Sequence, residues 1–306
     1  MDLVNRIGNR LRRDFFGSLY RRQVRGILDT PPVQRGDRDF IQLSMVHTRD
    51  VLPYLAAAKS FARYAAPRRI VVVCDPSITA EDRATLVQHI PFIELLEAAD
   101  FRHADIPQGG TWERLFAIAN LASDNYVVQV DADTLTLDTP HDVITAIDAG
   151  NGFVIGEEIG QGTISFEQAR TRMQPWIHLH DAHVQVLSET ALPDLGLPPS
   201  SRYVGGCSGF TGFPPSQTMR EDMLEFSRRM TAHLGKHWTR WGTEQVTSNY
   251  LVANTRGFAV LPFPRYATPD VSTTATIFKH YIGHQRFRSS AYVKDTRDFL
   301  RSYAAS

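Results

Sequence analysis

Residues 126–134 are Tyr-Val-Val-Gln-Val-Asp-Ala-Asp-Thr, an apolar run that ends abruptly in two carboxylates. A run of this kind predicts a buried strand, and the change in polarity predicts that the strand ends at Asp131. Side chains alternate between the two faces of a strand, so Asp131 and Asp133 are expected to point the same way. Oxygen ligands in that arrangement suit a hard divalent cation such as Mg²⁺ or Mn²⁺. An ordinary surface turn is the alternative, because Asp-x-Asp is a common sequence.

The chain before this stretch alternates between predicted strands and predicted helices. A β-branched run predicts a buried strand over residues 69–74, and strands are also predicted over residues 40–46 and, more weakly, 92–96. Helical spacing predicts helices over residues 50–64, 79–89 and 111–122. Thr79 with Asp82 forms an imperfect capping box, and Thr111 is the expected N-cap of the helix before the central strand. This alternation predicts an α/β fold with a mostly parallel sheet, whose first half of about 100 residues resembles a nucleotide-binding platform.

Beyond Asp133 the alternation is less regular. A strand is predicted over residues 152–157, and helices over residues 219–234, from about 243, and over 290–303. Residues 160–199 are rich in proline, histidine and glutamine and predict a functional or disordered loop. Within it, His178 and His180 either share a strand face and bind a metal or belong to a polar, substrate-facing wall. Four glycines in residues 205–212 indicate either backbone pressed against a bulky group or a turn in a buried strand.

Composition excludes several classes of protein. The 306 residues are 42% apolar, enough for one large domain or two small ones, and 33 basic residues balance 33 acidic ones. The charge balance gives no indication of nucleic-acid binding. No apolar stretch is long enough for a membrane span, and the first residues do not resemble a signal peptide. Two cysteines, Cys74 and Cys207, are not a disulfide framework, so we expect a cytoplasmic protein, or one peripheral at the inner membrane face.

The first 28 residues form a distinct unit. An apolar residue recurs every fourth position, which predicts one apolar stripe along a helix. The stripe consists of Leu3, Ile7, Leu11, Phe15 and Leu19. Seven arginines and two aspartates give residues 1–28 a net charge of +5. Such a helix either lies on an anionic membrane surface or packs on its own domain or a partner subunit. Residues 30–36, with two prolines and a glycine, predict a linker.

From Gly110 onward four motifs resemble the retaining glycosyltransferases of the glycogenin and bacterial lipopolysaccharide-galactosyltransferase type, which are family 8-like enzymes with the Rossmann-like GT-A fold. The motifs are Arg114 on the helix before the central strand, Asp131-Ala-Asp133, Glu244-Gln245 with Asn249, and His280-Tyr-x-Gly283-x-x-Arg286. Including the order of strands and helices, the resemblance spans most of residues 40–288. The basic helix and linker of residues 1–36 precede the GT-A domain, which the resemblance implies for residues 37–306. Its nucleotide-binding half would cover about 37–135 and its acceptor-side half about 136–306.

The resemblance also implies roles for these residues. Asp131, Asp133 and His280 would hold Mn²⁺ or Mg²⁺, with Asp133 also counted among the catalytic residues. Arg286, Gly283 and Arg114 would bind the nucleoside-diphosphate sugar, most simply a UDP-sugar, and His47-Thr48 would meet its base or ribose. Gln245 would lie beneath the anomeric carbon and Glu244 would bond the sugar hydroxyls. Residues 205–208 and the histidine-rich segment would line the acceptor side, where a polysaccharide, glycolipid or protein would bind.

Several positions depart from the family pattern. Arg286 stands where the family has lysine, and its planar fork can bind a phosphate bidentately. Phe287-Arg288 replaces Pro-Trp, Cys207 replaces an asparagine and Val246 replaces an aspartate. The metal and diphosphate motifs therefore match better than the sugar-recognition motifs. The sequence predicts a metal-dependent glycosyltransferase, with a sugar-phosphate nucleotidyltransferase and an inactive binding scaffold as the alternatives.

Overall fold

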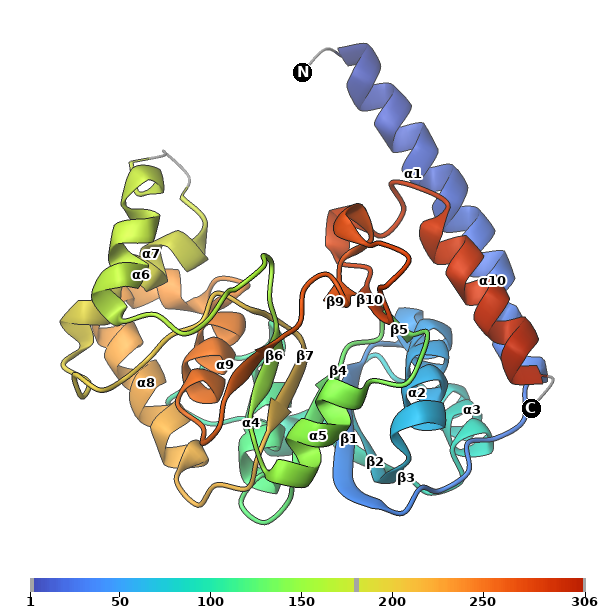
Figure 1. Cartoon of the computed structure of the whole chain (residues 1–306), viewed down its shortest axis with the longest axis horizontal. Coiled ribbons are helices and arrows are strands. Elements are labelled where there is room, and N and C mark those ends of the chain that lie inside the picture. The colour runs from blue at the N-terminus through green and yellow to red at the C-terminus, as the bar shows by residue number, and fades with distance from the viewer. Residues whose placement is uncertain (1–2, 179–181, 305–306) are drawn as a thin grey trace. The chain divides into compact units, whose positions relative to one another are not determined.

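The structure, a computed structural model, describes residues 3–178 and 182–304. By the density of their internal contacts these residues form two compact units (Figure 1). Unit 1 contains residues 1–95, 130–141 and 264–306, and unit 2 contains residues 96–129 and 142–263. Within the described residues no helix combines the length and the apolar character that crossing a bilayer requires.

Unit 1 is built around two parallel strands that the sequence predicts. Strand β1 (Arg38–Val46) pairs with β2 (Pro67–Cys74) in register from Ile41 opposite Arg69 to Val46 opposite Cys74. The two strands are joined by helix α2 (Val51–Ala65), which is buried along most of its length. Helix α3 (Ala80–His89) follows β2, and the partly buried strand β3 (Ile93–Glu97) comes next. The predicted strand–helix order of this half is confirmed.

Two terminal helices lie side by side in unit 1 (Figure 1). Helix α1 (Leu3–Val24) continues into the 3₁₀ turn η1 (Arg25–Asp29), and helix α10 (Ala291–Ala304) is the last element. They meet through aromatic rings, with Tyr20 stacked on Tyr292 at 4.0 Å between ring centroids. The predicted amphipathic helices at both ends are therefore present. Tyr20 and Val24 of α1 are buried, whereas Leu11, Phe15 and Leu19 of the predicted apolar stripe are exposed.

A small sheet completes unit 1. Its strand order is β5 (Thr134–Thr136), β10 (Phe278–His280) and β9 (Tyr266–Ala267). Strand β10 runs antiparallel to β5 and parallel to β9. The 3₁₀ turns η2 (Thr48–Asp50), η7 (Pro269–Val271) and η8 (Gly283–Gln285) lie in the connections of this unit.

Unit 2 contains antiparallel and parallel strand pairs covered by helices. Strand β6 (Phe153–Ile155) runs antiparallel to β7 (Cys207–Phe213) and parallel to β8 (Ala259–Leu261). The remaining strand is the fully buried β4 (Val127–Val130), whose last residue belongs to unit 1. The helices are α4 (Trp112–Leu121), α5 (His141–Ala149), α6 (Phe166–Met173), α7 (Val184–Ala191), α8 (Met219–Leu234) and α9 (Thr243–Ala253). Short 3₁₀ turns accompany them: η3 (Ala98–Phe101), η4 (Gln174–Trp176), η5 (Leu192–Leu195) and η6 (Gly235–Thr239).

Seven strands form one mixed sheet in the order β3-β2-β1-β4-β7-β6-β8. Helices flank this sheet, so the predicted α/β class is confirmed (Figure 1).

The prediction of a loop over residues 160–199 is wrong. This segment contains helices α6 and α7 and the turns η4 and η5. Helix α6 begins with a capping box, in which Ser165 and Gln168 bond each other's backbone N–H groups. This pairing satisfies two N–H groups that the first turn of a helix leaves without partners. His178 is exposed and His180 lies outside the described residues, so their predicted metal site is not assessed.

The capping box at the start of α3 is complete. Thr79 Oγ1 accepts a hydrogen bond from the Asp82 N–H at 3.1 Å, and the Thr79 N–H donates to Asp82 Oδ2 at 2.9 Å. Thr79→Ala should therefore lower the free energy of unfolding by about 1 kcal/mol, measured by urea denaturation. Thr85→Ala is the matched control, because the Thr85 hydroxyl only bonds the Glu81 carbonyl within the same helix. That variant should change stability by less than about 0.5 kcal/mol, and equal losses in both would contradict the capping role.

Candidate metal and donor site

The turn at residues 131–133 joins strand β4 to strand β5. The Thr134 hydroxyl donates to the Asp131 carbonyl at 2.8 Å and holds the turn closed. Asp133 is buried and Asp131 is half-buried. Both carboxylates thus follow the central strand at its carboxyl end, as the sequence predicts.

His280 reaches this turn because β10 pairs with β5. His280 lies opposite Thr134 in the antiparallel register, and the Tyr281 N–H donates to the Asp133 carbonyl at 2.8 Å. The His280 Nε2 atom then lies 3.1 Å from Asp133 Oδ1 and 3.9 Å from Asp131 Oδ2. Residues 147 positions apart in the chain are therefore in contact.

Arg286 is the cation of this cluster. Gly283 adopts a φ of +32°, which a glycine tolerates easily, and the 3₁₀ turn that follows returns the chain toward Asp133. The Arg286 guanidinium forms an ion pair with the Asp133 carboxylate, lies 3.6 Å from Asp50 Oδ1 and donates from Nε to the Tyr281 carbonyl at 3.3 Å. Two carboxylates and a carbonyl thus fix the position of this side chain.

The charges around Asp133 shift its pKa. Burial alone raises the pKa of this carboxyl, but the neighbouring His280 and the Arg286 guanidinium outweigh it and hold the pKa well below the usual range. The same ion pair, despite burial, raises the pKa of Arg286 above that of a free guanidinium. Asp133 is therefore a carboxylate, and a potential ligand, at any physiological pH.

The three side chains Asp131, Asp133 and His280 fit a divalent cation. Each offers one ligand atom, and the three atoms lie within 4.8 Å of one another. Two carboxylate oxygens and an imidazole nitrogen suit Mn²⁺ better than Ca²⁺, which prefers oxygen alone.

Asp50 is a member of this cluster that the sequence reasoning missed. It follows strand β1 closely, and its carboxylate contacts both Arg286 and Arg49, the latter at 3.2 Å. The signal was present, because an acid just after a buried strand is what singled out Asp131. In the sequence, Asp50 is the first residue of the predicted helix 50–64, and an acid at the start of a helix is common without any role in a site.

His47 and Thr48 lie at the carboxyl end of β1, as predicted. His47 Nδ1 accepts from the Arg49 N–H at 3.2 Å, so this nitrogen caps the turn η2. The Thr48 hydroxyl donates to Asp82 Oδ2 at 2.8 Å, and its N–H donates to Ser77 Oγ at 3.2 Å. Thr48 therefore has a structural role, and contact of either residue with a nucleotide stays a prediction.

Arg114 and Glu244 form a buried ion pair inside unit 2. The Arg114 guanidinium donates to Glu244 Oε1 at 3.0 Å, and the exposed fractions of the two side chains are 6% and 4%. The Thr111 hydroxyl donates to Glu244 Oε2 at 3.2 Å. Thr111 precedes α4 as predicted but has a positive φ of 74° and makes no side-chain cap. Its hydroxyl joins the ion pair instead of capping the helix.

Gln245 and the glycine-rich strand are adjacent in unit 2. Ser208 Oγ lies 3.4 Å from Gln245 Oε1, and Asn249 Nδ2 donates to the Gly206 carbonyl at 2.9 Å. A Cβ atom at Gly212 would lie 2.2 Å from the Phe153 ring, so this glycine is required by packing inside the unit. The bulky group pressed against the backbone at this position is therefore an aromatic side chain of the protein.

Comparisons with known proteins identify the fold. Neither the family models nor the curated proteins gave a match. Among solved structures, an active-site mutant of LgtC is similar with a TM-score of 0.51 and 12% identity, over 86% of this chain and 96% of that one. The bifunctional glycosyltransferase WbbM is similar with a TM-score of 0.51 and 15% identity, over 88% of this chain and 52% of that one. The fold is that of the GT-A glycosyltransferases.

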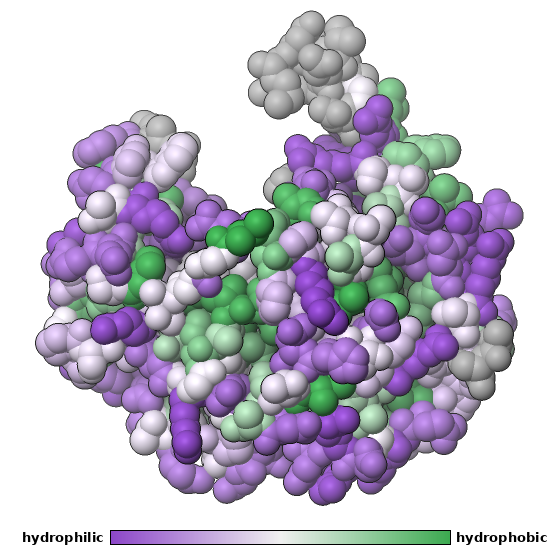
Figure 2. Space-filling view, viewed as in Figure 1, coloured by the Kyte–Doolittle hydropathy of each residue, from purple (hydrophilic) through white to green (hydrophobic). Residues whose placement is uncertain are grey.

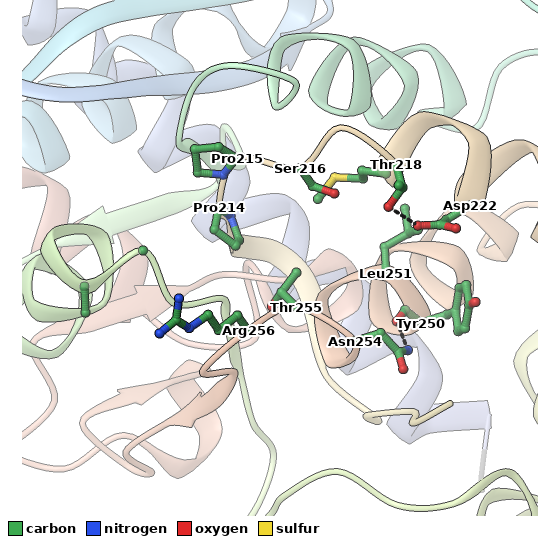
Figure 3. A pocket seen from close by; sticks show the side chains of 13 residues that line it. Pro214, Pro215, Ser216, Thr218, Asp222, Tyr250, Leu251, Asn254, Thr255 and Arg256 are labelled. Carbon is green, nitrogen blue, oxygen red and sulfur yellow. Dashed lines mark hydrogen bonds between the residues drawn. The ribbon is translucent and has the colours of Figure 1, made fainter. Parts of the chain in front are cut away.

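One pocket of unit 2 is lined by other residues than those predicted for the GT-A site. It has a volume of about 390 Å³ and lies between the end of α5, the residues after β7 and the end of α9 (Figure 3). Among its lining residues, Thr218 donates a hydrogen bond to Asp222 Oδ2 at 2.8 Å and Asn254 donates to the Tyr250 carbonyl at 2.7 Å. None of the predicted site residues lines it.

Proposed function

We propose that this protein is a metal-dependent glycosyltransferase that moves a sugar from a nucleoside-diphosphate sugar to a glycan, lipid-linked or protein acceptor, with retention of anomeric configuration. The observation that carries the proposal is the convergence of Asp131, Asp133 and His280 next to Arg286. A GT-A fold and two glycosyltransferases among its structural neighbours support it.

The chemistry requires stabilisation of a leaving diphosphate. The bond between the anomeric carbon and the diphosphate oxygen breaks, a bond to the acceptor oxygen forms, and the acceptor proton leaves with the diphosphate. A divalent ion held by Asp131, Asp133 and His280 would act as a Lewis acid toward that negative charge, a contribution of several kcal/mol. Arg286 would add a permanently charged donor fork for the same phosphates.

The protein positions these groups in advance. Asp50 and the Tyr281 carbonyl fix the Arg286 side chain, and the pairing of β10 with β5 fixes His280. Preorganised charges of this kind stabilise charge that develops during a reaction without having to rearrange. The roles of Glu244 and Gln245 toward the donor sugar remain proposals, as does the choice of a UDP-sugar.

A screen of sugar nucleotides tests this function. Purified protein is incubated with UDP-, GDP-, ADP- and dTDP-sugars in Mn²⁺, Mg²⁺ or chelator, and the release of nucleoside diphosphate is measured. We expect release with Mn²⁺ from at least one donor, and none with chelator. The same donor at about 100 times its dissociation constant should stabilise the fold by about 2.7 kcal/mol. Binding of no donor in Mn²⁺, or release of pyrophosphate in place of nucleoside diphosphate, would contradict the proposal.

A further inference from the structure

Helix α1 has two apolar faces, and only one of them packs against unit 1. Tyr20 and Val24 are buried, with Tyr20 against Tyr292 and its ring centroid 5.5 Å from that of Phe287. A residue nine positions before Tyr20 lies about half a turn away around an α-helix. Leu11 occupies that position, so it faces away from the packed side.

The outer face of α1 is apolar and exposed. Its residues Leu11, Phe15 and Leu19 are 64%, 63% and 41% exposed. They recur every four residues and therefore form one continuous stripe. In Figure 1 the first half of α1 extends past the N-terminal end of α10, and in Figure 2 hydrophobic residues appear among strongly hydrophilic ones on the side where α1 and α10 lie. Three large apolar side chains in register differ from the isolated exposed residues that any surface carries.

Arginines border this stripe. Helical geometry places Arg12 beside Phe15 and Leu19, and Arg22 at the C-terminal end of the stripe; both arginines are exposed. Residues 1–28 carry a net charge of +5, whereas the whole chain carries none. The rest of the protein therefore has a net charge of −5, and the positive charge is concentrated on this one helix. Asp14 offsets little of it, because its contact with Arg10 is a 4.0 Å pair between exposed side chains.

We propose that the outer face of α1, defined by Leu11, Phe15 and Leu19 and bordered by Arg12 and Arg22, docks on an anionic lipid bilayer. An apolar stripe with flanking arginines lets the apolar side chains enter the interface while the guanidinium groups meet the lipid phosphates. A second copy of the chain is a poorer occupant, since two helices of charge +5 would repel each other. The proposal does not depend on the enzymatic activity.

Docking would also orient the metal ligands of unit 1. Tyr20 stacks on Tyr292, and Tyr292 stacks on Tyr281 at 3.9 Å between ring centroids. Tyr281 directly follows His280, and its hydroxyl donates a hydrogen bond to Asp295 Oδ2 of α10 at 2.6 Å. A chain of packed rings thus joins the membrane-binding helix to the strand that carries His280.

Sedimentation with vesicles tests the proposal on the full-length protein. The wild type should pellet with phosphatidylcholine vesicles that contain about 30% phosphatidylglycerol and stay in solution with pure phosphatidylcholine. Binding should weaken when salt rises from ~0.05 M to ~0.5 M, because the surface charges become screened. The double variant L11D/F15D should bind at least tenfold more weakly, since it places two carboxylates in the apolar stripe. R12Q/R22Q should lose about fivefold for each charge removed, mainly at low salt.

Val87→Asp is the matched control. Val87 is also a large exposed apolar residue of unit 1, on α3, and its replacement should leave vesicle binding unchanged. Thermal unfolding should show that L11D/F15D is about as stable as the wild type, because Leu11 and Phe15 are 64% and 63% exposed and Phe15 contacts Phe16 of the same helix. Equal pelleting with neutral vesicles, or full binding by L11D/F15D, would overturn the proposal. So would a lipid-free dimer that L11D/F15D converts to a monomer, because a second copy would then cover the stripe.

Discussion

Asp133→Asn should lower the affinity for Mn²⁺ by about 100-fold or more and remove Mn²⁺-dependent release of nucleoside diphosphate. The substitution keeps the shape of the side chain but removes a negative charge from the three-ligand cluster with Asp131 and His280. A hundredfold loss of Mn²⁺ affinity corresponds to about 2.7 kcal/mol of binding free energy. Activity should be lost with the ion, because the bound cation stabilises the charge of the transition state by several kcal/mol. Titration calorimetry with Mn²⁺ measures the affinity, and the donor assay measures the activity.

Asp50→Asn separates the metal role from the role of the ion pair. Asp50 also lies beside Arg286, at 3.6 Å, but it is not one of the three grouped ligands. This variant removes a carboxylate from the same arginine and should retain Mn²⁺ affinity within about threefold. If both variants lost the metal equally, Asp133 would act by positioning Arg286 and not as a ligand.

Acid stability gives an independent readout of the same residue. His280 and Arg286 hold the pKa of Asp133 below its value in the unfolded chain. A carboxyl group with a depressed folded-state pKa contributes stability that is fully present above about pH 4 and is lost as the pH falls further. The metal-free wild type should therefore lose stability more steeply below pH 4 than the asparagine variant does.

Local sequence patterns sufficed to predict most of the first half of the fold. Strands β1, β2 and β4 are mostly apolar runs whose residues are largely buried, and such runs differ clearly from helical spacing. The carboxylates at 131 and 133 were predicted from the end of one run alone. The position of His280 beside Asp133 does not follow from local patterns. The antiparallel pairing of β10 with β5 brings the two residues together, and local spacing does not encode a contact between residues 147 positions apart.

Three features that differ from the sequence-based expectation also depend on tertiary contacts: the packed face of α1, the role of Thr111 and the helices within residues 160–199. The sequence predicts an apolar stripe on α1 that includes Leu11, Phe15 and Leu19, but the stacking of Tyr20 on Tyr292 of α10 decides which face packs inward. Threonine is a favoured N-cap residue, yet the Thr111 hydroxyl contacts Glu244, a residue 133 positions later, and does not cap the helix. The short helices α6 and α7 lie in a segment whose composition indicates a loop, and packing against each other compensates for their weak local signal.

Arg114→Met should lower the free energy of unfolding by about 3–5 kcal/mol in urea denaturation. The guanidinium is replaced by an apolar side chain, and the Glu244 carboxylate, which is 4% exposed, loses its ion pair with Arg114 but stays buried. Leaving a charge buried without its counter-charge costs far more than the ion pair contributes, because the carboxylate has already lost its hydration. Exposed pairs such as Arg68 with Asp39 provide the control, and Arg68→Met should cost less than about 1 kcal/mol.

The double variant R114M/E244L decides between a structural and a donor-binding role for this pair. Replacing both charged side chains with apolar ones also removes the buried Glu244 carboxylate that Arg114→Met leaves without its guanidinium partner, so most of the lost stability should return. A double-mutant cycle would then give a large coupling energy between the two residues. If stability returns but Mn²⁺-dependent release of nucleoside diphosphate from the donor does not, the pair contacts the sugar nucleotide, as the sequence motif predicts. If turnover returns as well, Arg114 and Glu244 only hold α4 against α9, and sugar recognition must come from other residues of unit 2.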